Sequence, residues 1–137
     1  MKKIFIFLSI VLLFMPVMVH PDAVFFGPVE TMPEFPEGQR ALFQFLSEHV
    51  VYPPQSVTNE EEGKVIAQFI VEKDGSIDSI KVVRSSGYKA LDQEAVRALG
   101  LMPKWTPGTQ KGIAVRVRYT VPVNFRLPDE IEAPKTK

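Results

Sequence analysis

The chain has no cysteine, and only His20 and His49 supply imidazole among its 137 residues. Without cysteine there can be no disulfide framework, no C-x-x-C zinc site and no thiol nucleophile. Two histidines leave little material for a catalytic triad or for a metal centre. We therefore expect a protein that binds a partner rather than an enzyme, and we expect neither a metal nor a cofactor.

A net charge is also lacking, because 16 basic side chains balance 16 acidic ones. This balance argues against a nucleic-acid partner. The two signs are nevertheless segregated: residues 24–62 hold seven Glu and one Arg, whereas residues 63–126 hold eleven Lys or Arg and five Asp or Glu. Such a distribution either steers a partner or only solvates opposite faces of one domain.

The sequence contains no apolar run long enough for an ordinary membrane span. After two lysines, residues 4–19 are interrupted only by Ser9 and Pro16. As a helix this run would span about 24 Å, which is shorter than a hydrocarbon core of ~30 Å. The pattern predicts a signal peptide over residues 1–23 and an exported protein. The alternative is an uncleaved signal that tethers the chain to the inner membrane as a short anchor.

Composition divides the rest of the chain into three segments. Residues 24–37 are rich in Pro and Glu and follow neither a strand nor a helix period, which predicts an extended lead-in. Residues 38–127 carry the periodic apolar patterns and are predicted to form one domain. Residues 128–137 are polar, and we expect this tail to be disordered.

Two segments have apolar residues at helical spacing. In residues 39–50, Leu42, Phe43 and Leu46 fall on one helical face, and a Tyr-Pro-Pro sequence then ends the helix. Residues 91–102 repeat apolar side chains in the same way and stop near a glycine and a proline.

The strands are predicted from β-branched runs and alternation. Residues 64–72 and 77–84 flank an Asp74-Gly75 turn, which is typical of an antiparallel hairpin. Residues 113–125 alternate apolar and polar side chains, which predicts a long strand buried on one face. Pro122 cannot donate to a ladder, so it places this strand at a sheet edge, where a partner can dock. Together the elements predict an α+β fold, a two-layer sandwich of helices on an antiparallel sheet.

Several single residues have two interpretations. Trp105 either closes the core or forms an exposed recognition ring. Tyr52, fixed by the proline after it, either packs its ring over the first helix or presents its hydroxyl at a groove. His49 is interpreted as a capping cation or a partly buried ring, and the acidic run at residues 60–62 as a solvated turn rather than a cation site.

Five blocks of the sequence occur in a specific order and spacing. They are Tyr52-Pro53 and residues 63–77, 91–95, 105–108 and 115–125. Together they closely resemble the C-terminal domain of TonB, the periplasmic energy transducer of Gram-negative bacteria, over about residues 30–127. The lead-in at residues 32–38 is similar to the version common in Bacteroidetes. The resemblance implies two helices on a three-stranded antiparallel sheet, in the periplasm.

The resemblance also implies a partner and a site. Domains of this family bind the TonB box, a short peptide of TonB-dependent outer-membrane receptors, as an added strand beside the last strand, in energy-dependent transport of siderophores or other nutrients. The family's Tyr-Pro contact falls on Tyr52 and Pro53. The augmenting edge falls on Val115, Arg116, Val117, Arg118, Tyr119, Thr120, Val121, Val123 and Phe125. An open edge of this kind can also pair two copies into a homodimer.

Two features depart from the family pattern. Family transducers carry a serine and, four residues later, a histidine that couple them to ExbB and ExbD, but Ser9 is followed four residues later by Leu13. Residues 19–37 would reach only about 56 Å at ~3.1 Å per residue, which is short for the rod that crosses the periplasm. These departures favour, as an alternative, a stand-alone periplasmic accessory domain without energy transduction.

A second alternative is a domain that binds cell-wall glycan, or peptidoglycan. It would use the basic face of Arg116, Arg118 and Arg126, with Trp105 or Tyr119 as a stacking ring. An exposed ring beside the arginines would favour this function, whereas a bare edge strand with buried rings would favour peptide pairing.

Overall fold

The structure is a computed structural model that describes residues 23–128. The elements, in chain order, are β1 (Val24–Phe25), α2 (Gln39–His49), α3 (Pro54–Thr58), β2 (Gly63–Val71), β3 (Ile77–Arg84), α4 (Lys89–Leu99), β4 (Gly108–Gln110) and β5 (Ile113–Phe125). Within residues 23–128 no helix is both long enough and apolar enough to cross a membrane. The predicted signal peptide or anchor at residues 1–23 and the predicted tail at residues 128–137 lie outside the described residues, except for residues 23 and 128.

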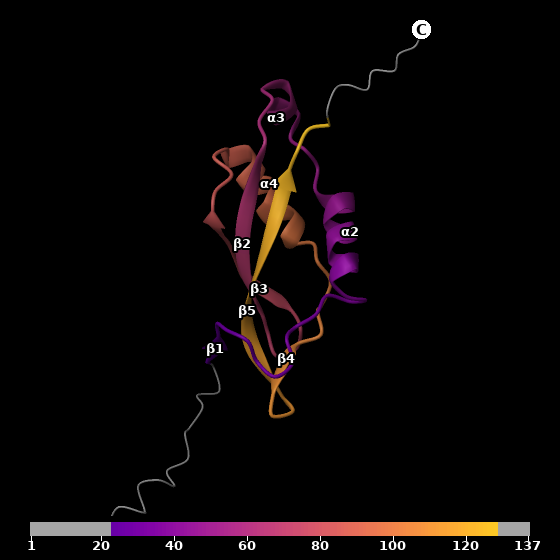
Figure 1. Cartoon of the computed structure of the whole chain (residues 1–137), viewed down its shortest axis with the longest axis vertical. Coiled ribbons are helices and arrows are strands. Elements are labelled where there is room, and N and C mark those ends of the chain that lie inside the picture. Colours follow the sequence, from indigo (N-terminus) through magenta and orange to yellow (C-terminus); the bar gives the residue numbers. More distant parts are fainter. Residues whose placement is uncertain (1–22, 129–137) are drawn as a thin grey trace, which may run out of the picture.

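The centre of the fold is an antiparallel trio of strands with β2 in the middle. β2 pairs with β3 through the predicted hairpin, and with β5 over nine residue pairs from Gly63–Phe125 to Val71–Val117. Figure 1 shows β2 and β5 side by side along the length of the molecule. The predicted α+β fold is confirmed, and the predicted three-stranded antiparallel sheet forms the centre of a five-stranded sheet that also has one parallel pair.

Three short elements extend this predicted core. β1 pairs in parallel with β5, which gives the strand order β1-β5-β2-β3, and β4 pairs with the start of β5. α3 is a five-residue helix that begins at Pro54, directly after the Tyr-Pro corner. The lead-in also forms single bridges to β4, at Thr31–Thr109, and to the loop before it, at Glu34–Thr106. Extended backbone gains hydrogen bonds by lying along another segment, and no local periodicity reveals that pairing.

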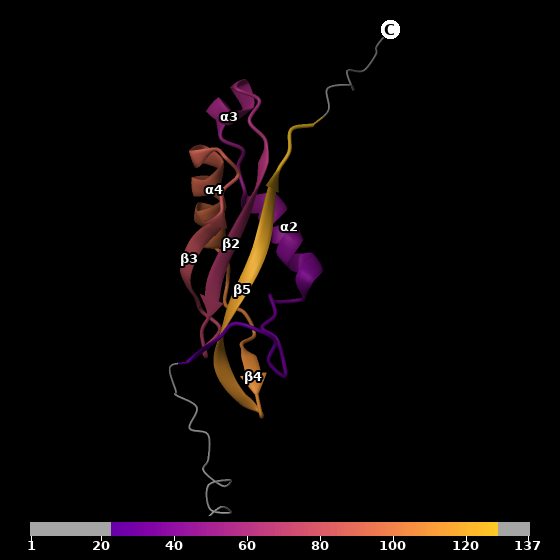
Figure 2. The ribbon, with the colours of Figure 1, turned by 60° about the vertical axis from the view of Figure 1, so that its left-hand side comes forward.

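Both long helices lie on one face of the sheet (Figures 1 and 2). α2 buries Leu42 and Leu46, and α4 buries Leu91, Ala95 and Leu99. They pack against the inward side chains of the sheet, which are Val65, Ala67, Phe69, Val71, Val121, Val123 and Phe125. Neither helix has a side-chain N-cap, so this burial, at about 1.5–3 kcal/mol for each large apolar side chain, holds the helices in place.

The hairpin turn between β2 and β3 is built as its sequence predicts. Gly75 has a φ of 88°, and the carboxylate of Asp74 accepts hydrogen bonds from the backbone N–H and the hydroxyl of Ser76. The carbonyl of Gly75 in turn accepts a 2.8 Å hydrogen bond from the N–H of Trp105. The turn is thereby tied to the loop that leads into β4.

Candidate functional site

The edge of β5 that faces away from β2, called the outer edge below, is the part of the predicted site that can pair with a partner. The N–H of Glu72 donates to the carbonyl of Ser76 at 2.9 Å, and thus points toward β3. Successive N–H groups of a strand alternate between its two edges. The backbone N–H of Val71 therefore points toward β5, and that of its partner Val117 points toward β2. Even-numbered residues of β5 therefore direct their backbone groups to the outer edge. Pro122 fits this assignment, since it has no N–H to give to the ladder with β2.

The beginning of the outer edge is already paired. Val24 and Phe25 of β1 lie in register with Arg116 and Val117. The ring of Phe26 then lies over the guanidinium of Arg118, 4.2 Å from its carbon to the ring centroid. Val115, further back in the strand, pairs with Gly108 of β4. Because Val115 has the same parity as Val117, this pairing lies on the edge of β5 that also faces β2, so β4 does not cover the outer edge.

The rest of the outer edge has no strand partner within residues 23–128. The backbone N–H groups of Thr120 and Asn124 point to this side, as do the carbonyls of Thr120, Pro122 and Asn124. Their side chains are exposed on the face of the sheet opposite the helices. An incoming strand can therefore form main-chain hydrogen bonds over this stretch without displacing any described strand.

The structure thus separates the residues predicted for the site into groups. Arg116 is held by a 2.8 Å ion pair with Glu72. The apolar side chains point into the core and their backbone groups face β2; these residues are Val117, Val121, Val123 and Phe125. Thr120 alone among the predicted residues combines an outward backbone with an exposed side chain. Pro122 and Asn124 are not among the predicted site residues, but they belong to the same group as Thr120. The missing N–H of Pro122 is the feature of the sequence that indicates which residues face the outer edge.

The other edge of the sheet, along β3, is less suited to an added strand. The pairing of β2 with β3 shifts register twice, between Ile66 and Ala67 and between Gln68 and Ile70. Ser79 in β3 has a φ of 55°, outside the strand region. Bulges of this kind are a common protection against edge pairing. By contrast, the β2–β5 ladder has no register shift.

A groove of about 330 Å³ runs between α2 and the end of β5. Figures 1 and 2 both show α2 beside the yellow half of β5, on the side away from β2. The lining residues are Phe43, Leu46, Ser47, Val50, Tyr52, Pro122, Val123, Asn124, Phe125 and Arg126. Most of these side chains are apolar, so the groove is suited to hold an apolar side chain of a strand that pairs with the outer edge.

Phe43 corrects one prediction from the helical pattern. The spacing predicts Phe43 on the apolar face of the first helix, but the residue is 46% exposed and forms part of the groove wall. The stripe continues instead through Leu42 and Leu46, because Phe43 is turned by 100° from its neighbour. An aromatic residue next to the buried residues of a helix is therefore the feature of the sequence that indicates this wall of the groove.

Tyr52 packs its ring and also uses its hydroxyl. The ring meets Phe125 edge to face, with centroids 5.5 Å apart, and the hydroxyl donates to the carbonyl of Glu61. Burial raises the pKa of Tyr52, and the charges of Glu62 and Glu61 raise it further, so the hydroxyl keeps its proton. Pro53 follows in extended conformation as the N-cap of α3. Tyr52 is therefore a fixed wall of the groove, with its hydroxyl already bonded within the domain.

Trp105 lies in the core, and Tyr119 is partly buried against it. Trp105 is 3% exposed, and its ring meets Tyr119 at 4.9 Å and Phe69 at 5.3 Å between centroids. His49 stacks on Phe45, and its Nδ1 donates to the Phe45 carbonyl at 2.9 Å, since a carbonyl can only accept. All three rings are thus held by internal contacts.

Comparisons with known proteins agree on one family. The family described as "Gram-negative bacterial TonB protein C-terminal" matches residues 48–127. Protein TonB of Neisseria gonorrhoeae is 43% identical over 47 residues, which cover 34% of this chain and 17% of that protein. Protein TonB of Haemophilus influenzae is 30% identical over 87 residues, which cover 59% of this chain and 31% of that protein. The chain therefore matches less than a third of the length of these curated relatives.

Solved structures share the fold. The solution structure of the Helicobacter pylori TonB C-terminal domain has a TM-score of 0.52 and 26% sequence identity, and the likeness covers 65% of this chain and 79% of that one. A second structure of that domain has a TM-score of 0.50 at 24% identity and shows the likeness of fold alone. The family match spans more than half of the sequence and the fold agrees with it, so the chain belongs to the TonB C-terminal domain family.

Proposed function

We propose that this domain binds the TonB box of outer-membrane receptors as an added strand on the outer edge of β5. The observation that carries the proposal is the regular, unpaired stretch of that edge beyond Val117, bordered by an apolar groove. Main-chain hydrogen bonds to the edge supply affinity, and the groove supplies specificity. Membership of the TonB C-terminal domain family supports the choice of partner.

The geometry also defines the kind of peptide that fits. Alternate side chains of an added strand point to opposite faces of the sheet. One set enters the groove, where Phe43, Val50 and Tyr52 favour apolar groups. The other set lies on the helix-free face beside Thr120 and Asn124. β1 pairs in parallel with β5 on this edge, so a peptide that runs parallel to β5 can pair with the edge in the same way.

The biological role that follows is receptor coupling in nutrient transport across the outer membrane. We infer a periplasmic domain that binds rather than catalyses, exported by its N-terminal segment or tethered to the inner membrane by it. Coupling to ExbB and ExbD is the transducer form of this function, and an accessory domain without energy transduction is the alternative. Co-purification of the full chain with ExbB and ExbD from membranes distinguishes the two forms, because only a transducer contacts the motor.

Peptidoglycan binding receives less support from the structure. The stacking rings expected for a glycan, Trp105 and Tyr119, pack against one another; Trp105 is buried, and Tyr119 is partly buried against the core. The exposed ring beside an arginine is instead that of Phe26, which lies over Arg118, so a glycan would have to use Phe26 rather than the two predicted rings.

The proposal is tested by an NMR titration of the 15N-labelled full chain with synthetic peptides that carry TonB boxes of receptors from the same genome. We expect amide shifts concentrated on residues 118–125 and on Val50 and Tyr52. A control peptide with a proline at every second position cannot form the ladder and should cause no shifts. Absence of shifts with every TonB box would overturn the proposal, and shifts that depend on protein concentration alone would indicate a homodimer through this edge.

A further inference from the structure

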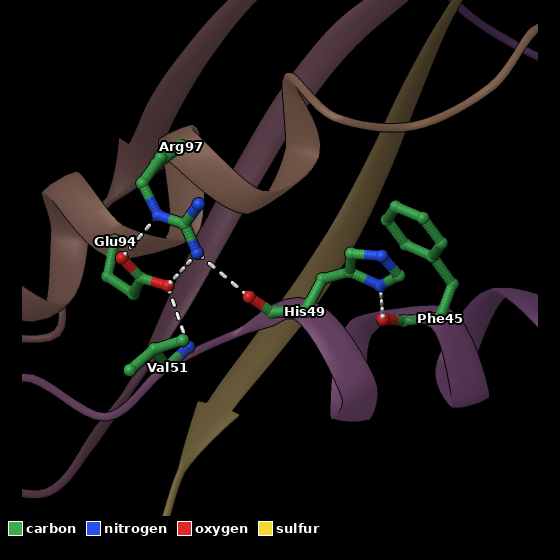
Figure 3. Close-up of polar contacts among 5 residues, drawn as sticks. All are labelled: Phe45, His49, Val51, Glu94 and Arg97. Carbon is green, nitrogen blue, oxygen red and sulfur yellow. Dashed lines mark hydrogen bonds and ion pairs between the residues drawn. The ribbon is translucent and has the colours of Figure 1, made fainter.

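A clamp of hydrogen bonds and an ion pair connects α4 to the end of α2 (Figure 3). The backbone N–H of Val51 donates to a carboxylate oxygen of Glu94 at 2.7 Å. Arg97 holds the same carboxylate through two nitrogens, at 2.8 and 2.7 Å, and donates to the carbonyl of His49 at 2.8 Å. Two side chains of α4 thus fix the backbone on both sides of Val50.

The clamped residues alternate with the residues that line the groove. His49 and Val51 are bonded to α4 through their backbones, whereas Val50 and Tyr52 line the groove. Val50 is extended, with φ −77° and ψ 123°, so successive side chains of this segment point to opposite sides. A bond at positions 49 and 51 therefore sets where the side chains at positions 50 and 52 stand.

The clamp also supplies what the end of α2 lacks. The last carbonyls of a helix have no partner within the helix, and a cation near them is favoured by the helix dipole. Arg97 provides both the donor and the charge at His49. Its own helix is firmly anchored, since Leu91, Ala95, Ala98 and Leu99 of α4 are fully buried in the domain. The position of the groove wall is therefore set by a helix that is itself fixed in the core of the protein.

We propose that Glu94 and Arg97 are positioning residues for the peptide groove, and that they set its affinity by holding Val50 and Tyr52 in place. This inference rests on the proposed function. Neither side chain lines the groove, so both act through the segment that connects α2 to α3. Arg97 lies outside the five sequence blocks, and Glu94, although within residues 91–95, is not among the residues predicted for the site.

The test compares Glu94→Gln and Arg97→Lys with the native full chain. A glutamine keeps one acceptor oxygen and loses the charge that holds Arg97. A lysine keeps its charge but cannot reach both the carboxylate and His49 with a fork of nitrogens. We expect each variant to bind a synthetic TonB-box peptide about tenfold more weakly, the effect of losing a hydrogen bond to a charged group. Glu48→Gln is the matched control, because it removes the same charge from an exposed position on α2.

A readout without peptide separates positioning from general damage to the fold. Amide exchange at Val51 should accelerate in Glu94→Gln, and nuclear Overhauser contacts between Tyr52 and Phe125 should weaken. Protection of the β2–β5 ladder, followed at Val65 and Ala67, should stay native. These measurements do not require that any peptide binds.

Each outcome decides a different point. Weaker peptide binding with an intact ladder, and unchanged binding by Glu48→Gln, support the inference. Native affinity in both clamp variants overturns it and leaves the proposed function standing. If the native chain itself binds no TonB box, the proposed function fails, and native Tyr52–Phe125 contacts in Glu94→Gln then overturn the positioning role as well.

Discussion

Gly75 and Trp105 touch through their backbones, at the point where the hairpin turn meets the loop before β4. The N–H of Trp105 donates to the carbonyl of Gly75 at 2.8 Å. A Cβ atom placed on Gly75 would lie 2.0 Å from the carbonyl oxygen of Trp105. This contact explains why the turn requires glycine for space as well as for its positive φ, and why Trp105 is held in the core.

Gly75→Ala is therefore expected to destabilise the domain strongly. The substitution combines a left-handed backbone, at about 1–2 kcal/mol, with a backbone clash that the surrounding structure cannot relieve by a rotamer change. We expect a total loss of at least about 3 kcal/mol, measured as the free energy of unfolding in urea. Gly87→Ala is the control, since Gly87 also has positive φ, at 99°, but has no atom within 4 Å of its Cβ position. Equal losses for the two variants would contradict the role of the Trp105 contact.

Thr120→Pro tests the outer edge of β5. The outward N–H of Thr120 lies on the open stretch, so a proline removes one donor to the partner and leaves the ladder with β2 intact. We expect peptide affinity to fall about fivefold to tenfold, measured by isothermal titration calorimetry.

Thr120→Ala is the matched control for this variant. It keeps the N–H and loses only the side chain, which accepts a 3.2 Å hydrogen bond from Gln68. We expect near-native peptide affinity for it. If the alanine and proline variants bind equally well, the partner does not use this backbone donor.

The Glu94 clamp predicts a pH dependence of stability. The hydrogen bond from Arg97, together with that from Val51, lowers the pKa of Glu94 below its usual value of 4.5. A carboxyl whose pKa is lower in the folded state stabilises the protein at a pH above its unfolded pKa. That contribution is lost as the pH falls through the lowered folded pKa.

Unfolding free energies of the native chain and Glu94→Gln should therefore differ by about 1–2 kcal/mol at neutral pH and converge as the pH falls below the lowered folded pKa of Glu94. Asp74 and Asp92, whose pKa values are also lowered, titrate in both proteins and cancel in the difference. Urea denaturation between neutral and acidic pH measures the two curves. A constant difference over this range would mean that the charge of Glu94 does not stabilise the clamp.

Phe26→Ala is expected to raise the affinity for a long peptide. The ring of Phe26 is 70% exposed and covers Arg118, and β1 holds the same edge that a partner strand would use. Loss of a cation–π contact of about 0.5–1 kcal/mol should loosen β1 and improve binding about twofold to fivefold, measured by calorimetry. Met32→Ala changes an exposed apolar residue of the same lead-in beyond β1 and should have no effect. Unchanged affinity in Phe26→Ala would mean that the partner strand does not extend along β5 as far as Arg118 and so does not compete with β1.

The order and type of the main elements could be read from local patterns. Asp74-Gly75 encodes its turn through the two residues themselves, and the alternation over residues 113–125 encodes a strand buried on one face. The helix predicted over residues 91–102 begins two residues earlier and ends three earlier, at Leu99, because helix ends depend on capping contacts that periodicity does not show. The resemblance predicts that the Tyr-Pro sequence belongs to the site, and in the structure Tyr52 forms a wall of the groove.

The sequence by itself determined the main helices and strands, the α+β class and the family, because short-range periodicity and turn chemistry are properties of neighbouring residues. The tertiary structure alone decided which stretch of β5 is open, that β1 pairs beside it, and that Glu94 reaches Val51 across 43 positions of the chain. The open edge consists of the backbone groups that the other strands leave unpaired. The clamp depends on which helix packs against the segment between α2 and α3. Both depend on long-range packing, so no local pattern in the chain can specify them.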